Sequence, residues 1–384
     1  MRVTIVVPRY GTDVIGGAET LARGFAQAAA RRGWAVEVWT TCARSHYTWK
    51  NTYKPGQEES EGVVLHRFAV AQQDADRQAE LNKRLERQGR LGADDQYTWL
   101  ESGAHSPLLY DHVARHAAEF DALIALPCAS PLAHYAAWTV PDRAIVWPCL
   151  HDEPYAYMEP NRVLLESCRG VMFLSPEERD LAVRHLGIHP RRSGTIGGGV
   201  SMDRQHSRAA QPPQDLLYVG RLEPGKGLAL LYDYVTRYAD QGGDAHLVVL
   251  GRGPLKPPSH QAFEYRGFVS EAKKARAYES ALALCQPSLN ESFSLTIMES
   301  WLAARPVLVH SQCAVTRGHV RRSRGGLWFQ TYEEFAGAIE WLRANPTQAE
   351  RMGENGRKYV ARNYSWEAVL SRFERTIGRW EKDA

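Results

Sequence analysis

Two glutamates frame the stretch of this sequence that most resembles a chemical site. Glu291 and Glu299 stand in the segment NESFSLTIMES at 290–300, which follows an apolar, strand-like run at 281–288. A loop that leaves a strand and opens a helix directs backbone N–H groups and the positive end of the helix dipole at one spot. Carboxylates there would repel a phosphate, so we expect them to address hydroxyl groups of a sugar or ribose. On spacing alone, a charged amphipathic helix start explains the two glutamates equally well.

A second stretch, GRLEPGKG at 220–227, follows the apolar run DLLYVG at 215–220. Arg221 and Lys226 lie on this glycine-rich turn, and two cations beside glycine amides suit a diphosphate. The Walker order G-x-x-x-x-G-K-[ST] is absent, which disfavours ATP hydrolysis. GRGP at 251–254 closes a neighbouring strand with glycines that let a ligand approach the backbone. Diphosphate cations, a glycine-lined base site and hydroxyl-binding carboxylates together describe a nucleotide-sugar pocket.

The first half of the chain offers weaker candidates. His151 directly follows the strand-like run AIVWPCL at 144–150, and ligands of open parallel sheets bind beyond the carboxyl ends of strands. A surface histidine that caps a loop is the plain alternative. Gly16 and Gly17 precede a predicted helix and would let a ligand approach the backbone, although a structural turn explains them as well. The loop before them lacks the G-x-G-x-x-G fingerprint, so no motif supports NAD binding.

Composition excludes several classes of protein. The 384 residues are 44% hydrophobic and 24% charged, as in an ordinary globular protein, and exceed what one core usually supports. The formal net charge of +3 is too small to indicate a nucleic-acid partner. The six cysteines are scattered without C-x-x-C spacing, which favours reduced thiols in a cytoplasmic protein. No apolar run is long enough for a membrane span, so any membrane contact is expected to be peripheral.

A possible metal motif, DAD at 74–76, falls in the very polar, helix-like stretch 74–90 with no strand before it. Metal-binding D-x-D motifs need a strand end that gathers the carboxylates, so we expect no metal there. An acceptor site is harder to predict. Aromatic and polar residues of the first-half loops could stack on a sugar ring or could equally be packing: Tyr97, Trp99, His105, Tyr155 and Tyr157.

Strands and helices alternate twice along the chain. The first series begins with the βαβ pattern of strand 3–8, a helix near 18–32 and strand 35–41. Residues 194–214, rich in Gly, Pro and polar side chains, are the expected linker to a second series. The fold prediction is therefore α/β, with two doubly wound parallel sheets. The last helix, near 364–380, has apolar residues at helical spacing that need a partner surface.

In order and spacing, these motifs resemble a retaining glycosyltransferase of family 4, glycosyl transferases group 1, over nearly the whole chain. The resemblance rests on GGAE at 16–19, HDE at 151–153, GRLEPGKG, GRGP, RGFV at 266–269, the E-x7-E pair and GGLWF at 325–329. It implies the GT-B fold, with two facing Rossmann-like domains and a cleft between them. Residues 1–198, completed by the helix at 364–384, would form the acceptor side, and residues 199–363 would bind the donor.

The resemblance also implies roles for single residues. Arg221 and Lys226 would hold the donor diphosphate, Glu299 the ribose hydroxyls, and Glu291 the transferred sugar. Further donor contacts are expected from the backbone and side chains of Gly17, Gly251, Arg252, Phe268, Ser294 and Leu295. His151 would line the cleft near the reacting end of the sugar. The implied co-substrate is a nucleoside-diphosphate sugar, of UDP or GDP type, and neither a metal nor another cofactor is expected.

Serines and a Cys-Ala pair depart from the family pattern. Ser292, Ser294 and the pair Cys313-Ala314 stand where relatives usually have glycines. These changes adjoin the expected sugar and bear on the donor's identity. The leading function is sugar transfer to a saccharide or small-molecule hydroxyl. Alternatives are a pseudo-glycosyltransferase, a donor hydrolase or epimerase, and a non-catalytic nucleotide-sugar-binding subunit. The acceptor, the linkage and the oligomeric state do not follow from the sequence.

Overall fold

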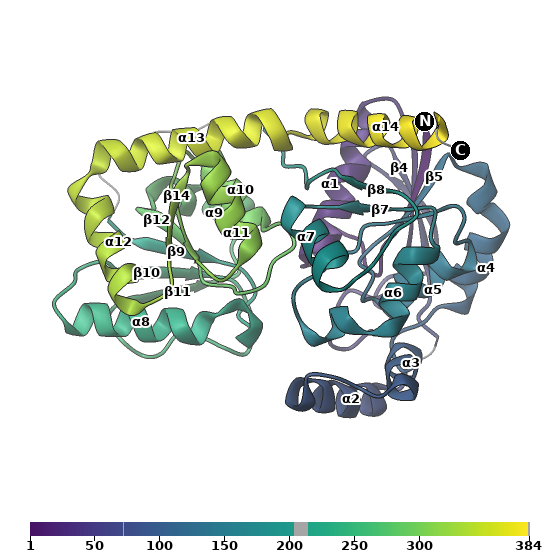
Figure 1. Cartoon of the computed structure of the whole chain (residues 1–384), viewed down its shortest axis with the longest axis horizontal. Helices are drawn as coiled ribbons and strands as arrows, with labels where there is room; N and C mark the ends of the chain where they lie inside the picture. Colours follow the sequence, from purple (N-terminus) through teal and green to yellow (C-terminus); the bar gives the residue numbers. More distant parts are fainter. Residues whose placement is uncertain (72, 203–213, 383–384) are drawn as a thin grey trace. The chain divides into compact units, whose positions relative to one another are not determined.

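The computed structural model describes residues 1–71, 73–202 and 214–382, and the chain forms two compact units. The amino-terminal unit comprises Met1–Gly199 together with Trp366–Ala384, and the carboxyl-terminal unit comprises Val200–Ser365. Figure 1 shows a parallel-type sheet with helices around it in each unit. The predicted fold class, α/β with two doubly wound sheets, is confirmed.

The amino-terminal unit is built on an eight-stranded sheet in the order β3-β4-β2-β1-β5-β6-β7-β8. Every described pair is parallel except β3 with β4. The strands are β1 (Arg2–Val6), β2 (Ala35–Thr41), β3 (Gly56–Ser60), β4 (Val63–Phe68), β5 (Ala122–Ala125), β6 (Ala144–Val146), β7 (Gly170–Phe173) and β8 (Ser193–Thr195). Its helices are α1 (Gly17–Arg31), α2 (Ala75–Gln88), α3 (Ala93–Glu101), α4 (Pro107–His116), α5 (Pro131–Thr139), α6 (Glu159–Ser167), α7 (Pro176–Asp180) and α14 (Trp366–Lys382), with short turns at Ala117–Glu119, Pro154–Tyr157 and Leu181–His185.

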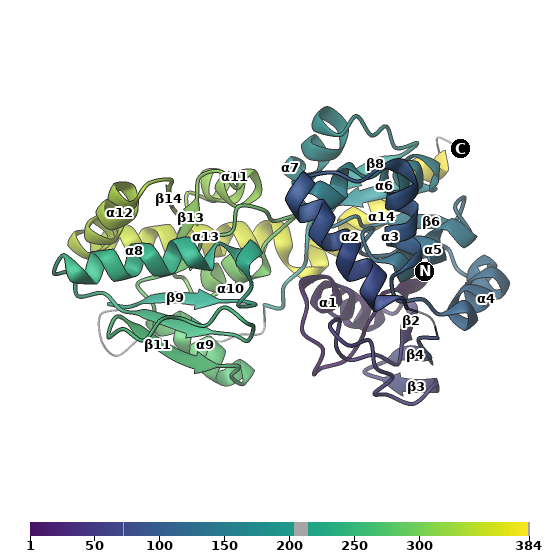
Figure 2. The same ribbon diagram turned by 90° about the horizontal axis from the view of Figure 1, so that it is seen from below.

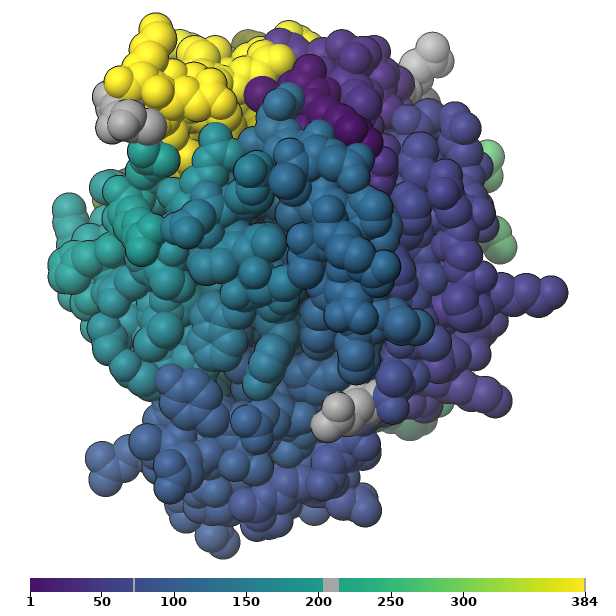
Figure 3. Space-filling view, turned by 90° about the vertical axis from the view of Figure 1, so that its right-hand side faces the viewer, coloured from purple at the N-terminus to yellow at the C-terminus, as the bar shows by residue number. Residues whose placement is uncertain are grey.

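The carboxyl-terminal helix α14 closes one face of this sheet against α1. Phe373 is fully buried, and its ring centroid lies 5.3 Å from that of Phe25. The ring of Trp366 occupies the space where a Cβ at Gly24 would lie, 2.3 Å away, so the approach of the two helices depends on glycine. Figures 1 and 3 show the same arrangement, with α14 in yellow beside the purple N-terminal segments. The apolar stripe read from the sequence is thus buried by the helix that starts the chain's first βαβ unit.

The carboxyl-terminal unit has a six-stranded sheet, all of whose described pairs are parallel, in the order β11-β10-β9-β12-β13-β14. Its strands are β9 (Leu216–Val219), β10 (Leu247–Leu250), β11 (Phe263–Gly267), β12 (Ala283–Gln286), β13 (Val307–His310) and β14 (Gly326–Phe329). Its helices are α8 (Leu228–Asp240), α9 (Glu271–Ser280), α10 (Leu295–Leu302), α11 (Ala314–Ser323), α12 (Tyr332–Ala344) and α13 (Pro346–Tyr364), with a single turn at Pro224–Lys226. Leu216, Leu247 and Leu308 pack with residues of α8 and α12 in one buried core.

Two features differ from the sequence prediction. Strand β3 was not predicted because all of its residues, GQEES, are exposed, so no alternation of apolar side chains marks it. It pairs with β4 as an antiparallel edge hairpin, which Figure 2 shows beside β2. The expected linker at 194–214 begins inside β8, which pairs with β7, and its residues 203–213 lie outside the described residues.

Candidate functional site

The strand order of the carboxyl-terminal sheet marks where a ligand would bind. The chain runs outward from β9 through β10 to β11 and then returns to place β12 on the other side of β9. Loops that follow strands on either side of such a switch diverge and leave a crevice at the carboxyl ends. GRLEPGKG follows β9, and the loop that carries Glu291 follows β12. The two stretches singled out in the sequence therefore flank one switch point.

Lys226 and Glu291 meet directly at this point. The Lys226 Nζ lies 2.8 Å from Glu291 Oε1, and only 18% and 10% of the two side chains are exposed. Gly227 makes the approach possible because its φ is +70° and a Cβ there would lie 2.4 Å from the Pro287 carbonyl oxygen. The cation expected to bind phosphate is thus paired with the carboxylate expected to bind the sugar.

Glu299, in α10, has two partners that the sequence did not reveal. Lys274 Nζ donates to Glu299 Oε1 at 3.0 Å, and the hydroxyl of Tyr278 donates to Glu299 Oε2 at 2.9 Å. Lys274 and Tyr278 both lie on α9, one helical turn apart, and Tyr278 is buried. Their spacing of four residues was visible in the sequence, but nothing linked that face of α9 to Glu299.

Gln286, the last residue of β12, organises the loop that follows. Its Nε2 donates to Ser294 Oγ and to Thr296 Oγ1, both at 3.2 Å, and lies 3.4 Å from Glu291 Oε1. Its Oε1 is buried and has no hydrogen-bond partner among the described residues. Ser294 is the N-cap of α10 in a left-handed conformation, with φ 70°. The serine that replaces a family glycine is therefore held by hydroxyl bonds in a conformation that usually favours glycine.

Beyond β9, β10 and β11 lie four more of the residues predicted to bind the donor. Gly251 has φ +146°, and a Cβ there would lie 1.8 Å from the carbonyl oxygen of Gly220, so only glycine fits. Arg252 lies over the exposed ring of Phe268, 5.1 Å from its centroid. Arg221 NH1 lies 2.9 Å from Glu223 Oε2. An aromatic ring with a guanidinium above it offers an apolar face to a flat ligand.

The candidates of the amino-terminal unit follow strand ends in the same way. His151 follows β6, with Nδ1 3.6 Å from Glu153 Oε2 and its backbone N–H directed at the Tyr155 hydroxyl. A Cβ at Gly17 would meet nothing within 4 Å, whereas one at Gly16 would lie 1.9 Å from Glu19 Oε2. The packing requirement therefore falls on Gly16, and the backbone at Gly17 is open.

A buried carboxyl group, Glu178, supports the loop that carries His151. Its Oε1 accepts from the backbone N–H of Leu150 at 2.7 Å, and its Oε2 accepts from that of Leu174 at 2.5 Å. Burial raises the pKa of Glu178 to about 8, while these and other backbone donors lower it. Cys149, which lies between β6 and His151, has a left-handed backbone conformation with φ 53°. Glu178 thus joins the ends of β6 and β7, a role that its position in a helix's first turn did not reveal.

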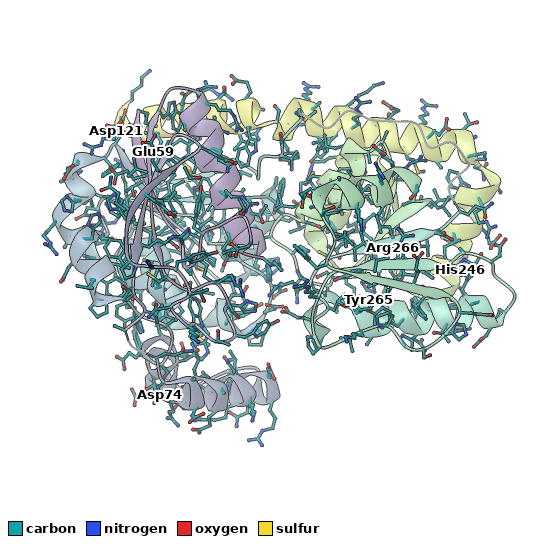
Figure 4. The ribbon with its side chains drawn as sticks, turned by 180° about the vertical axis from the view of Figure 1, so that it is seen from behind. Glu59, Asp74, Asp121, His246, Tyr265 and Arg266 are labelled. Atoms are coloured by element: carbon teal, nitrogen blue, oxygen red, sulfur yellow. The ribbon has the colours of Figure 1, made fainter. Side chains whose placement is uncertain are left out.

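Other sequence candidates have structural roles. Asp74 caps α2 by accepting from the Arg77 backbone N–H at 3.0 Å, and Figure 4 labels it at the start of that helix. Trp99 and His105 are both buried. The Trp99 indole N–H donates to Asn82, and the His105 ring hydrogen-bonds to the Tyr110 hydroxyl and the Leu100 carbonyl, so both side chains pack rather than face a ligand. Within residues 1–71, 73–202 and 214–382, no helix is both long and apolar enough to cross a membrane.

Known proteins resemble this chain in sequence and in fold. A D-inositol 3-phosphate glycosyltransferase of Streptomyces bingchenggensis is 24% identical over 250 residues, which cover 57% of this chain and 54% of that protein. The chain thus spans about half the length of the curated relatives that it matches.

Among solved structures, sucrose-phosphate synthase from Thermosynechococcus elongatus superposes with a TM-score of 0.73 at 17% identity and covers 100% of both chains. Anabaena HepE in complex with UDP gives a TM-score of 0.71 at 13% identity, covering 99% of this chain and 100% of that one. The family model for glycosyl transferases group 1 matches residues 201–359, which carry the paired Lys226 and Glu291. The resemblance read from the sequence is confirmed at this level: the chain has the GT-B fold, and its residues 201–359 are similar to the glycosyl transferases of group 1.

Proposed function

We propose that this protein transfers a sugar from a nucleoside-diphosphate sugar to a hydroxyl group of a saccharide or small-molecule acceptor, with retention of the anomeric configuration as in family 4. The observation that carries the proposal is the switch point of the carboxyl-terminal sheet, where Lys226 pairs with Glu291 and, in the helix that follows the same loop, Glu299 pairs with Lys274. Cations for a diphosphate and carboxylates for hydroxyl groups lie there within one set of loops. This arrangement suits a nucleotide sugar and gives ATP hydrolysis no Walker loop.

Donor binding divides among the loops in chain order. Arg221 and Lys226 neutralise the diphosphate, together with the N–H groups that begin α10 at Leu295, where the Ser294 side chain makes no cap bond. Arg252 and Phe268 offer a face for the base, and Gly251 lets the base approach the backbone. HepE of Anabaena, which has the same fold, was solved with UDP, and a UDP- or GDP-type donor fits this set of contacts.

Glu299 and Glu291 read different parts of the donor. Lys274 and Tyr278 orient the Glu299 carboxylate, which is left to accept from ribose hydroxyls. Glu291 releases Lys226 when the diphosphate takes its place, and then accepts from a hydroxyl of the transferred sugar. Residues 199–363 accordingly form the donor-binding domain, and residues 1–198 with 364–384 form the acceptor side, where Gly17 and His151 lie.

The retaining reaction places no nucleophile on the protein. The acceptor oxygen attacks the anomeric carbon from the face that the leaving diphosphate occupies, the bond from carbon to phosphate oxygen breaks, and that phosphate oxygen takes the acceptor's proton. Negative charge grows on the departing diphosphate. Fixed cations at Arg221 and Lys226 stabilise this charge without reorganisation, which is the main contribution expected from the protein.

The test is a panel of nucleotide sugars with and without hydroxyl acceptors, monitored by diphosphate release and by anomeric NMR signals of the product. Transfer predicts release that depends on acceptor, with the donor's anomeric configuration kept. Release without an acceptor indicates a hydrolase, and donor binding without any release indicates a binding subunit. Lys226→Ala should lower turnover by about a hundred- to a thousand-fold, whereas the exposed Lys256→Ala serves as the matched control. A Lys226→Ala enzyme with normal turnover would refute the assigned phosphate role.

A second set of variants separates the two glutamates. Glu299→Gln should weaken nucleotide binding, because ribose is held in ground and transition states alike, and Glu291→Gln should mainly lower kcat. Lys274→Ala tests whether Glu299 acts directly: it should cost less affinity than Glu299→Gln, and the exposed neighbour Lys273→Ala should cost none. Equal losses of affinity for both glutamate variants, with unchanged kcat, would show that the roles are wrong.

A further inference from the structure

One carboxylate and two imidazoles gather in the amino-terminal unit, away from the residues discussed above. Glu37 on β2, His66 on β4 and His112 on α4 each offer a ligand atom, and these atoms all lie within 4.8 Å of one another. β2 and β4 pair in parallel with Trp39 opposite His66, and α4 packs on β2. Three neighbouring elements therefore supply the cluster, which we call the histidine–glutamate cluster. All three side chains are partly buried.

The spacing of the cluster suits a small metal ion. His66 Nε2 lies 3.2 Å from Glu37 Oε2, and the rings of His66 and His112 have centroids 5.0 Å apart with an interplanar angle of 37°. Two ligands of a tetrahedral zinc ion with bonds of about 2.0–2.1 Å lie roughly 3.3 Å apart. His112 offers its ligand atom within 4.8 Å of those of the other two residues.

His112 supplies an independent sign of a missing partner. Its Nε2 is buried and forms no hydrogen bond with any described residue. A buried polar nitrogen without a partner is unfavourable, and a bound cation would supply that partner.

The surroundings of Glu37 resemble the support usually found around metal-binding carboxylates. The indole N–H of Trp39 donates to Glu37 Oε2 at 3.0 Å. The guanidinium of Arg2 lies 3.6 Å from the other oxygen, Oε1. Hydrogen bonds of this kind fix the orientation of a ligand before the metal arrives.

We propose that Glu37, His66 and His112 bind one divalent transition-metal ion, with Zn²⁺ preferred, and that the ion fastens α4 to β2 and β4. Two imidazoles and one carboxylate form an established zinc donor set, and water fills the fourth position. The site is structural, because Glu37 and His66 lie inside their strands, which end at Thr41 and Phe68, whereas the sugar-transfer candidates follow strand ends. It is independent of the diphosphate site, where no metal is proposed.

The test begins with the full chain stripped by EDTA and dialysed into metal-free buffer. One equivalent of ZnSO₄ is added, the protein is gel-filtered, and zinc is measured by mass spectrometry beside thermal melting. Wild type should retain one zinc per chain and melt at a higher temperature, because a ligand that binds only the folded state stabilises it. His66→Ala and Glu37→Gln should lose both effects.

A matched control is His246→Ala in the other unit, where the imidazole has a carboxylate neighbour, Asp215, 3.3 Å away (Figure 4 labels His246). This variant should keep the zinc and the gain in melting temperature. Melting in EDTA shows whether each variant folds. NMR of ¹⁵N-histidine-labelled wild type needs no variant: zinc should shift two imidazoles in one stoichiometric step. The proposal is overturned if wild type retains no zinc, if the cluster variants retain as much, or if zinc leaves the histidine spectrum unchanged.

Discussion

Replacing Glu178 by glutamine tests how the loop before His151 is held. In the structure each carboxyl oxygen of Glu178 accepts from a different backbone N–H, that of Leu150 and that of Leu174. In glutamine one of those oxygens becomes an NH₂ group, which faces a backbone donor and cannot accept from it. One hydrogen bond is lost and one buried N–H is left without an acceptor. The expected cost is about 1–3 kcal/mol of folding free energy, independent of pH.

The wild-type carboxyl group also makes a contribution to the folding free energy that depends on pH. Burial raises the pKa of Glu178 from 4.5 to about 8. The folded protein therefore holds a proton that the unfolded chain releases above pH 4.5, so the stability of the folded state is full below pH 4.5 and falls as pH rises through 8. The loss amounts to about 3 kcal/mol by pH 7 and about 5 kcal/mol above pH 8. Glutamine has no such loss.

Glu178→Gln should therefore be less stable than wild type below about pH 5, and the gap should close and reverse between about pH 5 and pH 7. Urea unfolding of both proteins at each pH measures the difference in folding free energy, and the difference cancels contributions of other titrating groups. The conservative control Glu177→Gln, in the same turn but only partly buried, should show no pH-dependent difference. A constant gap between wild type and Glu178→Gln at every pH would refute the raised pKa.

Three further outcomes are expected. Phe373→Ala should cost about 3–5 kcal/mol in urea unfolding, because the ring is fully buried between helices; a cost below about 1 kcal/mol would contradict the packing of α14. Gly251→Ala should lower melting temperature and donor affinity, because its Cβ would lie 1.8 Å from the Gly220 carbonyl oxygen, whereas Gly337→Ala, whose Cβ meets nothing, should not. Sugar transfer should survive excess EDTA if Lys226 meets the phosphate charge. Activity that is lost to chelation and restored by magnesium would contradict this prediction. If only zinc restores the activity, and restores thermal stability with it, the loss points to the histidine–glutamate cluster.

The sequence predicted those features of the fold and the candidate site that local residue patterns determine. Apolar runs separated by glycine-rich turns gave both sheets, and motif order gave the loops that follow β9 and β12, because parallel strands bring their carboxyl ends to one edge. It could not give β3, whose five exposed polar residues carry no hydrophobic pattern. The sequence also could not predict that Lys274 would pair with Glu299 or that Glu178 would accept from the Leu150 backbone N–H. Both contacts depend on how helices pack beside distant strands.

The pairing of Lys226 with Glu291 gives the proposed donor site a definite electrostatic state. A lysine exposed by 18% and a glutamate exposed by 10% would each be costly to hold without a counter-ion, and at 2.8 Å each supplies the other's. A simple anion gains little by entering, since it must displace Glu291 and leave that carboxylate partly buried without its cation. Under the proposed function, a nucleoside-diphosphate sugar avoids this cost, because its phosphate takes Lys226 while a sugar hydroxyl donates to the released Glu291. The proposal therefore predicts that this ion pair selects a whole nucleotide sugar over phosphate, because both halves of the ligand arrive together.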